Sequence, residues 1–148
     1  MSTIVAMKKA LVDVVASAPA FSGVQVTYGE VVNNPRRERF YLGDVEDHEM
    51  TPATMRAAKV RTEEDYTLKV LLSVDGNASQ EVTETRALVL LGALEDLLAG
   101  DPKLSAASTP PGILWATPSG FTLSSSLVAE KTHRTLIEAD VAVRARNS

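Results

Sequence analysis

The fold class that this sequence predicts is α+β, and three observations point to it. The segment from Glu64 to Asp75 alternates apolar and polar residues, as a strand with one buried face does. An amphipathic helix, Ser79 to Ala99, follows at once. The other strand-like segments show no regular alternation with helices, which argues against a doubly wound nucleotide-binding fold. We therefore expect a single domain over residues 1–148: a mixed or antiparallel sheet of about five to six strands, with two helices packed on one face and long exposed loops.

The N-terminal half is expected to hold one helix and three strands. Pro19 ends the first helix because it lacks a backbone donor and restricts the residue before it, and Ser2 or Thr3 is a suitable N-cap. In chain order we predict a helix at about 2–18, a strand at 24–28, a loop at 29–37, a strand at 38–45, an acidic turn at 44–49, an exposed loop or short helical turn through Thr54, and the long strand from about Lys59 to the turn Asp75-Gly76-Asn77.

The C-terminal half is expected to hold one helix and three strands. The helix is capped by Asn77 or Ser79 and ends at Gly100, which suits the left-handed C-terminal cap position, with Pro102 just beyond. Its sheet-facing residues are predicted to be Leu88, Leu91, Leu94 and Leu98. After a loop at 105–112 we predict strands at 113–117 and 121–128, joined by a hairpin turn at 118–120, and a last strand at 134–146.

Composition limits the functions that this chain can carry. The formal net charge of −4 and the pI near 5.2 argue against attraction of the whole molecule to nucleic acid. Cysteine is absent, which excludes disulfides, thiolate metal sites and a cysteine nucleophile. No segment approaches the length of a membrane-spanning helix, and the N-terminal segment reads better as an amphipathic helix than as a secretory signal. The composition fits a protein made in the cytoplasm.

The sequence contains no motif that predicts catalysis or a cofactor. The acidic run around His48 could supply oxygen ligands to a divalent cation, but it lacks the ligand spacing and glycine of a calcium loop, so we favour a solvated turn. His133 is the only other histidine, and Ser124, Ser125 and Ser126 do not lie in a strand-to-helix nucleophile elbow. We therefore expect no enzyme, no metal and no cofactor.

One compact basic cluster stands out, formed by Arg36, Arg37 and Arg39, with Lys59 and Arg61 predicted beside it. Clustered arginines attract phosphate, and several subunits carrying such clusters could line a channel for DNA. The alternative, which we favour, is that these arginines pair with the acidic turn nearby.

Two features bear on contacts with other chains. Trp115 lies in a short apolar segment, where a lone tryptophan is most often a core anchor and second most often an interface residue. The last strand carries Glu138 and Asp140 and then Arg144 and Arg146 on its polar face. That strand could pair head-to-tail with a neighbouring subunit. Alternatively, its polar face is simply exposed to solvent, which is the usual case for such a face.

The order of these segments resembles the tail terminator proteins of long-tailed bacteriophages, particularly those of actinobacterial phages. The resemblance covers nearly the whole chain. It rests on the segments APAFSGVQVTYG, RERFYLGDVE, EEDYTLKVLLSV, VTETRALVLLGALEDLLAGDP, ILWA, GFTL and ADVAVRAR. The combination of LGDVE, the long strand, the helix ending in GDP and the late tryptophan is its most specific part.

The resemblance implies a structural virion protein of the tail-neck region. Such a protein would cap the completed tail tube as a hexameric ring, stop polymerisation of the tube and provide the head-tail joining surface. Its partners would be copies of itself, the major tail tube protein, a head-tail connector or neck protein, and DNA passing through the lumen without sequence-specific contact; no membrane is implied. Alternatives are another neck component, such as a connector or stopper, and a small intracellular module that binds nucleic acid or an acidic ligand.

Under this resemblance, candidate contacts lie in the loops and on the polar strand faces. The loops at 29–37 and 44–59 are candidates for contacts with other proteins, because loops vary while the sheet stays constant. The candidate lumen or ring contacts are Arg36, Arg37, Arg39, Lys59 and Arg61. The candidates for packing or a lateral interface are Trp115, Phe121, Arg144 and Arg146.

Overall fold

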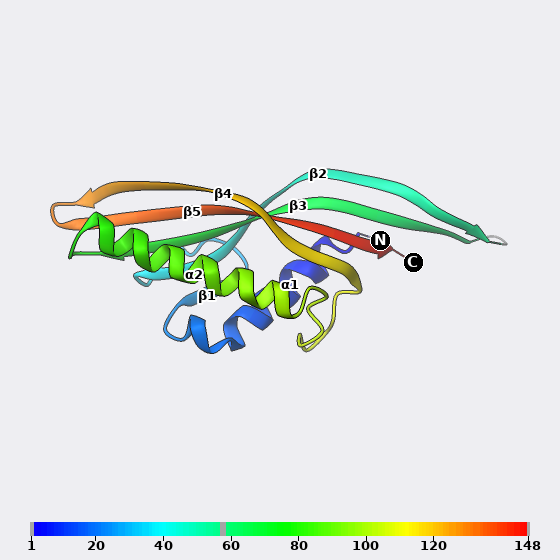
Figure 1. The fold of residues 1–148 in the computed structure, drawn as a ribbon, viewed down its shortest axis with the longest axis horizontal. Coiled ribbons are helices and arrows are strands. Elements are labelled where there is room, and N and C mark those ends of the chain that lie inside the picture. The colour runs from blue at the N-terminus through cyan, green and yellow to red at the C-terminus, as the bar shows by residue number, and fades with distance from the viewer. Residues whose placement is uncertain (1, 57–58, 148) are drawn as a thin grey trace.

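The computed structural model describes the backbone of residues 2–56 and 59–147, and the side chains of residues 2–52 and 62–146. Two helices and five strands form one α+β unit, as predicted (Figure 1). In chain order the elements are α1 (Ile4–Ser17), the 3-10 turn η1 (Pro19–Phe21), β1 (Gln25–Thr27), β2 (Glu38–Arg56), β3 (Lys59–Gly76), α2 (Gln80–Gly100), β4 (Ile113–Ala129) and β5 (Thr132–Asn147).

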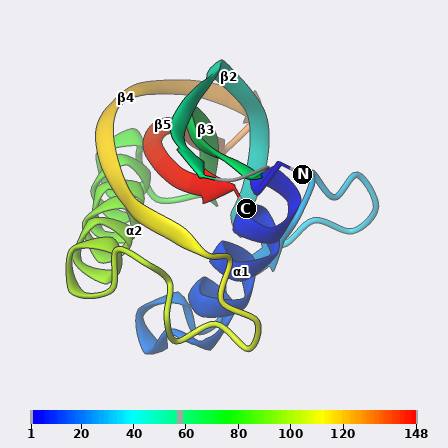
Figure 2. The same ribbon diagram turned by 90° about the vertical axis from the view of Figure 1, so that its right-hand side faces the viewer.

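The five strands form one mixed sheet in the order β1-β2-β3-β5-β4. The short β1 runs parallel to β2, and all other neighbours are antiparallel. Both helices lie on one side of this sheet, which is strongly twisted (Figures 1 and 2). The β2–β3 hairpin extends past both chain termini at one end of the molecule (Figure 1). Among the residues that the structure describes, no helix lies on the opposite side of the sheet.

The core lies between the helices and one face of the sheet. The period-two pattern of β3 and β5 directs alternate side chains to the helices, as predicted. On β3 and β5 these buried apolar residues are Tyr66, Leu68, Val70, Leu72, Val74, Ile137, Ala139, Val141, Val143 and Ala145. The matching helix residues are Met7, Ala10, Leu11 and Val15 on α1, and Ala87, Leu90, Leu91, Leu94 and Leu98 on α2.

The predicted core role of Leu88 is wrong, since its side chain is 44% exposed. Each helical residue turns by about 100°, so the buried stripe runs through Ala87, Leu91 and Leu94 and leaves Leu88 at its margin. Ser79 is the N-cap of α2 and accepts a hydrogen bond from the Val82 backbone N–H at 3.2 Å. Gly100 remains helical, and Asp101 follows it as the C-cap with a negative φ, so the left-handed glycine cap is also wrong.

The acidic turn and the exposed loop predicted between residues 44 and 54 are wrong, because this segment belongs to β2. Paired with β3, it forms a strand of 19 residues. Register shifts between Leu42 and Val45, between Glu46 and Glu49, and between Pro52 and Thr54 interrupt the ladder. Each bulge adds a residue to one strand and so breaks the alternation by which a strand is detected in a sequence.

The hairpin turn predicted at residues 118–120 is also wrong. Residues 113–129 form the single strand β4, which pairs with β5 on both sides of an irregularity between Pro118 and Gly120. A proline is tolerated here because β4 is an edge strand and one of its sides needs no backbone donors. The last strand, β5, lies between β3 and β4, so both of its edges are already paired. Head-to-tail pairing of this strand with another subunit is therefore excluded.

Candidate interaction surfaces

The open face of the sheet carries charged side chains that pair across neighbouring strands. Residues that lie opposite each other in the β3–β5 register have opposite charges, as in Asp75 with Arg134 and Lys69 with Asp140. Arg134 Nε donates to Asp75 at 2.8 Å, and Lys69 Nζ donates to Asp140 at 2.5 Å. Cross-strand pairs of this kind stabilise a sheet and fix its register.

Arg144 and Arg146, predicted as interface residues, lie on this open face. Both donate hydrogen bonds to Glu63 of β3, Arg146 at 3.1 Å. These hydrogen bonds lower the pKa of Glu63, and the bond from Arg144 has the largest effect. The two guanidinium groups therefore have partners within the chain, and they lie in the interior of the sheet rather than at its edge.

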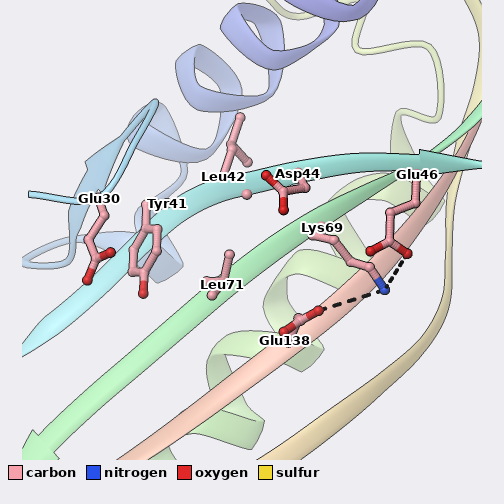
Figure 3. Close-up of a pocket in the computed structure, with 9 residues that line it drawn as sticks. Glu30, Tyr41, Leu42, Asp44, Glu46, Lys69, Leu71 and Glu138 are labelled. Carbon is pink, nitrogen blue, oxygen red and sulfur yellow. Dashed lines mark ion pairs between the residues drawn. The ribbon is translucent and has the colours of Figure 1, made fainter.

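A shallow concavity of about 300 Å³ lies on the same face, beside β2 (Figure 3). Its carboxylates come from Glu30, Asp44, Glu46 and Glu138. Lys69 is the only ammonium group in this lining, 3.6 Å from Glu46 and 3.8 Å from Glu138. Burial raises the pKa of Tyr41 in the wall. The concavity is acidic, with four carboxylates against one cation.

The predicted basic cluster is divided by the fold. Arg36 and Arg37 are exposed in the connection between β1 and β2. The Arg39 side chain is 12% exposed, and it donates to Ser73 at 2.7 Å and lies 3.6 Å from Asp75. Arg39 thus pairs with β3 and not with the acidic segment that we favoured, because Ser73 lies opposite it in the register.

Lys59 and Arg61 do not lie beside these arginines. Their backbone belongs to the far end of the β2–β3 hairpin, where Lys59 pairs with Arg56. A strand rises by about 3.3 Å per residue, so Lys59 and Ser73, the partner of Arg39, are about 45 Å apart along β3. The side chains of Lys59 and Arg61 are outside the described residues.

The sheet has two edges that lack a strand partner in the described part of the chain. One is the outer edge of β4, which contains no charged residue over its whole length, Ile113–Ala129. The other is the outer edge of β2, where β1 pairs only with residues 39–41. Exposed edge strands are usually protected by charges, so an uncharged edge of this length is a candidate interaction surface.

Exposed apolar side chains concentrate on β4 and the neighbouring helix. Trp115 lies opposite Arg144 on the open face and is 38% exposed, so the core-anchor interpretation is wrong. Phe121 lies opposite Ala139 on the helix side of the sheet and is 51% exposed. Ser125 Oγ donates to Glu84 at 2.8 Å and thereby holds α2 against β4. Among the described side chains, seven of the eleven large apolar ones that are exposed belong to α2 or β4: Val82, Leu88, Val89, Trp115, Phe121, Leu127 and Val128.

The buried carboxylate of Glu64 is not among the site residues that the sequence pattern predicts. It occupies the same phase of β3 as Tyr66 and Leu68, and its side chain is fully buried on the helix side. Its carboxylate accepts hydrogen bonds from Ser2, Thr3 and His48. The signal was present: a charged residue at a position where the alternation demands an apolar one.

No described helix is long and apolar enough to cross a membrane. The described residues also contain no group of three or more histidine or carboxylate side chains placed to share a metal ion.

The fold defines an α+β protein with one long mixed sheet covered by helices on a single face. A chain of the virion of a native gene transfer agent particle has this fold, with a TM-score of 0.51 over 94% of the present chain and 95% of the other. The two sequences are 14% identical, so the likeness concerns the fold. No protein-family model and no curated protein matches the sequence.

Proposed function

We propose that this protein is a structural, non-catalytic component of a phage-type virion, and that it is the tail terminator. In this role it caps the completed tail tube as a hexameric ring, stops tube polymerisation and joins the tail to the head. Two lines support the proposal: the nearly full-length fold likeness to a chain of a gene transfer agent virion, and the order of segments that resembles phage tail terminators. The protein would be made in the host cytoplasm and reside in the tail-neck region.

The observation that supports a ring is that the sheet has two different open edges, on β2 and on β4, at its opposite sides. Association through two different surfaces is head-to-tail and gives a closed ring when the rotation between subunits closes. The four long strands alternate in direction. Copies in the same orientation would therefore place β4 of one subunit antiparallel to β2 of the next.

Charge favours this unlike pairing over contact between two β2 edges. The open part of β2 carries the exposed carboxylates Asp44, Glu46, Asp47 and Glu49. Two such edges would repel each other, whereas the uncharged β4 meets them without repulsion. Phe121 and Trp115, on the two faces of β4, would then lie in or near the lateral contact. Arg36 and Arg37 are the basic residues of our predicted set that are exposed, and we assign them to ring or lumen contacts.

The test is the oligomeric state of the purified protein, with and without tail tubes. We expect hexamers in native mass spectrometry, or monomers that form rings at tube ends in electron micrographs. Phe121→Asp in β4 should raise the concentration needed for ring formation by at least about tenfold, because it buries a charge in an apolar contact. Val5→Asp is the matched control, since Val5 is 55% exposed on α1, which belongs to neither open edge of the sheet.

Three outcomes decide between the candidates. Rings on tube ends, weakened by Phe121→Asp and not by Val5→Asp, support the tail terminator. Rings that bind a connector but never a tube end would assign the protein to another neck component. A strict monomer that binds neither partner would overturn the proposal.

A further inference from the structure

The base of the β2–β3 hairpin contains an unusually well-bonded buried acid. The Glu64 carboxylate accepts from Ser2 Oγ at 2.6 Å, from the Thr3 backbone N–H at 2.8 Å, from Thr3 Oγ1 at 2.6 Å and from His48 Nε2 at 2.6 Å. The Tyr66 hydroxyl lies 3.1 Å from Thr3 Oγ1 and completes the network. We name Ser2, Thr3, His48 and Glu64 the Glu64 clamp.

The donors of the clamp come from two segments that are far apart in sequence. Ser2 and Thr3 precede α1, and Thr3 occupies its N-cap position without a capping bond from its own side chain. Glu64 of β3 accepts from the backbone N–H of Thr3 itself, and its negative charge lies at the helix end that favours an anion. The remaining donor, His48, belongs to β2.

A local distortion of β2 brings His48 to the clamp. The register shifts between Glu46 and Glu49, and Asp47 within that bulge has a φ of 53°. Aspartate tolerates this left-handed conformation better than most residues. The bulge turns the His48 ring to the helix side of the sheet, where it stacks on Tyr66 with ring centroids 6.1 Å apart.

The position of the clamp in the sheet gives it a mechanical role. Thr62, two residues from Glu64, is the last residue of β3 with a described partner in β5, namely Asn147. From there to the pair Arg56–Lys59 the described part of the hairpin is a two-stranded ribbon, and such ribbons are marginally stable without further support. The clamp is the point at which the N-terminal segment is hydrogen-bonded to the base of this ribbon.

We infer that the Glu64 clamp couples the N-terminal end of α1 to the β2–β3 hairpin, so that the two segments are ordered and released together. If Ser2 and Thr3 withdraw, a buried carboxylate keeps His48 as its single described donor. An anion buried with too few hydrogen-bond donors is strongly unfavourable. The segment of β2 around His48 therefore becomes less ordered as well. This coupling does not depend on ring formation and goes beyond the proposed function.

Burial and hydrogen bonding act in opposite directions on the charge of the clamp. Burial raises the pKa of Glu64, but the bonds from Ser2, Thr3 and His48 together outweigh it and lower the pKa to about 2. The acid is therefore ionised near neutral pH, which is the state in which it accepts all four hydrogen bonds.

Hydrogen exchange of the full chain, followed by mass spectrometry, tests the coupling. Ser2→Ala with Thr3→Val removes two donors by small changes at the N-terminus. We expect exchange in residues 44–52 to accelerate by about tenfold, although this segment is more than forty positions from the substitutions, because charged hydrogen bonds contribute about that much. In the reverse direction, His48→Ala should accelerate exchange in residues 4–8.

A matched control and a clear contrary result complete the test. Glu64→Gln should accelerate both segments, whereas Asp65→Asn, next to it on the open face, should accelerate neither. If Glu64→Gln does not fold, the double variant and His48→Ala still decide. Faster exchange confined to the mutated segment, or an equal increase throughout the chain, would overturn the coupling. Ring formation is measured separately, so its failure leaves this result unaffected.

Discussion

Glu63 and Glu64 are neighbours in β3, yet the two faces of the sheet give them different roles. Glu63 points to the open face and is held by Arg144 and Arg146. Glu64 points to the helix side, is fully buried, and is held by hydroxyls, a backbone N–H and a histidine. Surface ion pairs contribute little to stability, whereas a buried acid without its donors is costly. The face of the sheet, more than the residue type, therefore decides what a charge contributes to stability.

The largest expected difference between the faces concerns two adjacent leucines. Leu72 is fully buried on the helix side, and Leu71 lies partly exposed on the open face. Leu72→Ala should lower the free energy of unfolding by about 3 kcal/mol, because it leaves a cavity in the core. Leu71→Ala should lower it by about 1 kcal/mol or less. Urea denaturation measures both, and equal losses would contradict the two-faced description of the sheet.

Glu64→Gln and Glu63→Gln form the next comparison. The amide retains the shape of the side chain but introduces donors among groups that already donate to Glu64. We expect Glu64→Gln to lower the free energy of unfolding by about 2 kcal/mol. Glu63→Gln should give a change too small to resolve. A larger loss from Glu63→Gln would show that the open-face pairs are the stronger ones.

The contribution of Glu64 to the free energy of unfolding is expected to depend on pH, and the sign of this dependence is defined. The folded-state pKa of Glu64, about 2, is below its ordinary value of 4.5. Its contribution is therefore fully present above about pH 4.5 and is lost as the pH falls toward 2. The stability difference between the wild type and Glu64→Gln should shrink across this window in urea titrations. A difference that stays constant from pH 5 to pH 2 would mean that the acid is not held as described.

The smallest expected effect tests packing on the open face. A Cβ added at Gly43 would lie 2.8 Å from Leu71 Cδ1, at the flexible end of that side chain. Gly43→Ala should therefore cost about 1 kcal/mol of stability. Gly120, on the edge strand β4, has no atom within 4 Å of such a Cβ, so Gly120→Ala is the control and should be near neutral in thermal unfolding. Equal effects would indicate that the face is not closely packed there.

The sequence pattern predicted the strands with regular alternation, but it did not predict the full extent of the strands whose pairing contains irregularities. The long strands β3 and β5 were predicted to within a few residues, because one face of each is apolar at every second position. β2 was predicted too short, ending at residue 45, and β4 was divided into two strands, because the bulges and Pro118 interrupt the alternation as turns do. The positions of the candidate surface residues were predicted least well. The neighbours of Arg39, Lys59 and Trp115 are set by pairing across strands, which the sequence pattern does not show.

The α+β class, the helix-covered face of the sheet and the absence of cysteine chemistry could all be predicted from the sequence, since periodicity and composition are local properties of the chain. Which edges stay open, which arginines stay exposed and which donors bind the buried carboxylate became visible in the fold alone. These depend on strand order and register, in which residues more than sixty positions apart, such as Thr3 and Glu64, become neighbours. No local pattern specifies such partners, because they are selected by the packing of the whole domain.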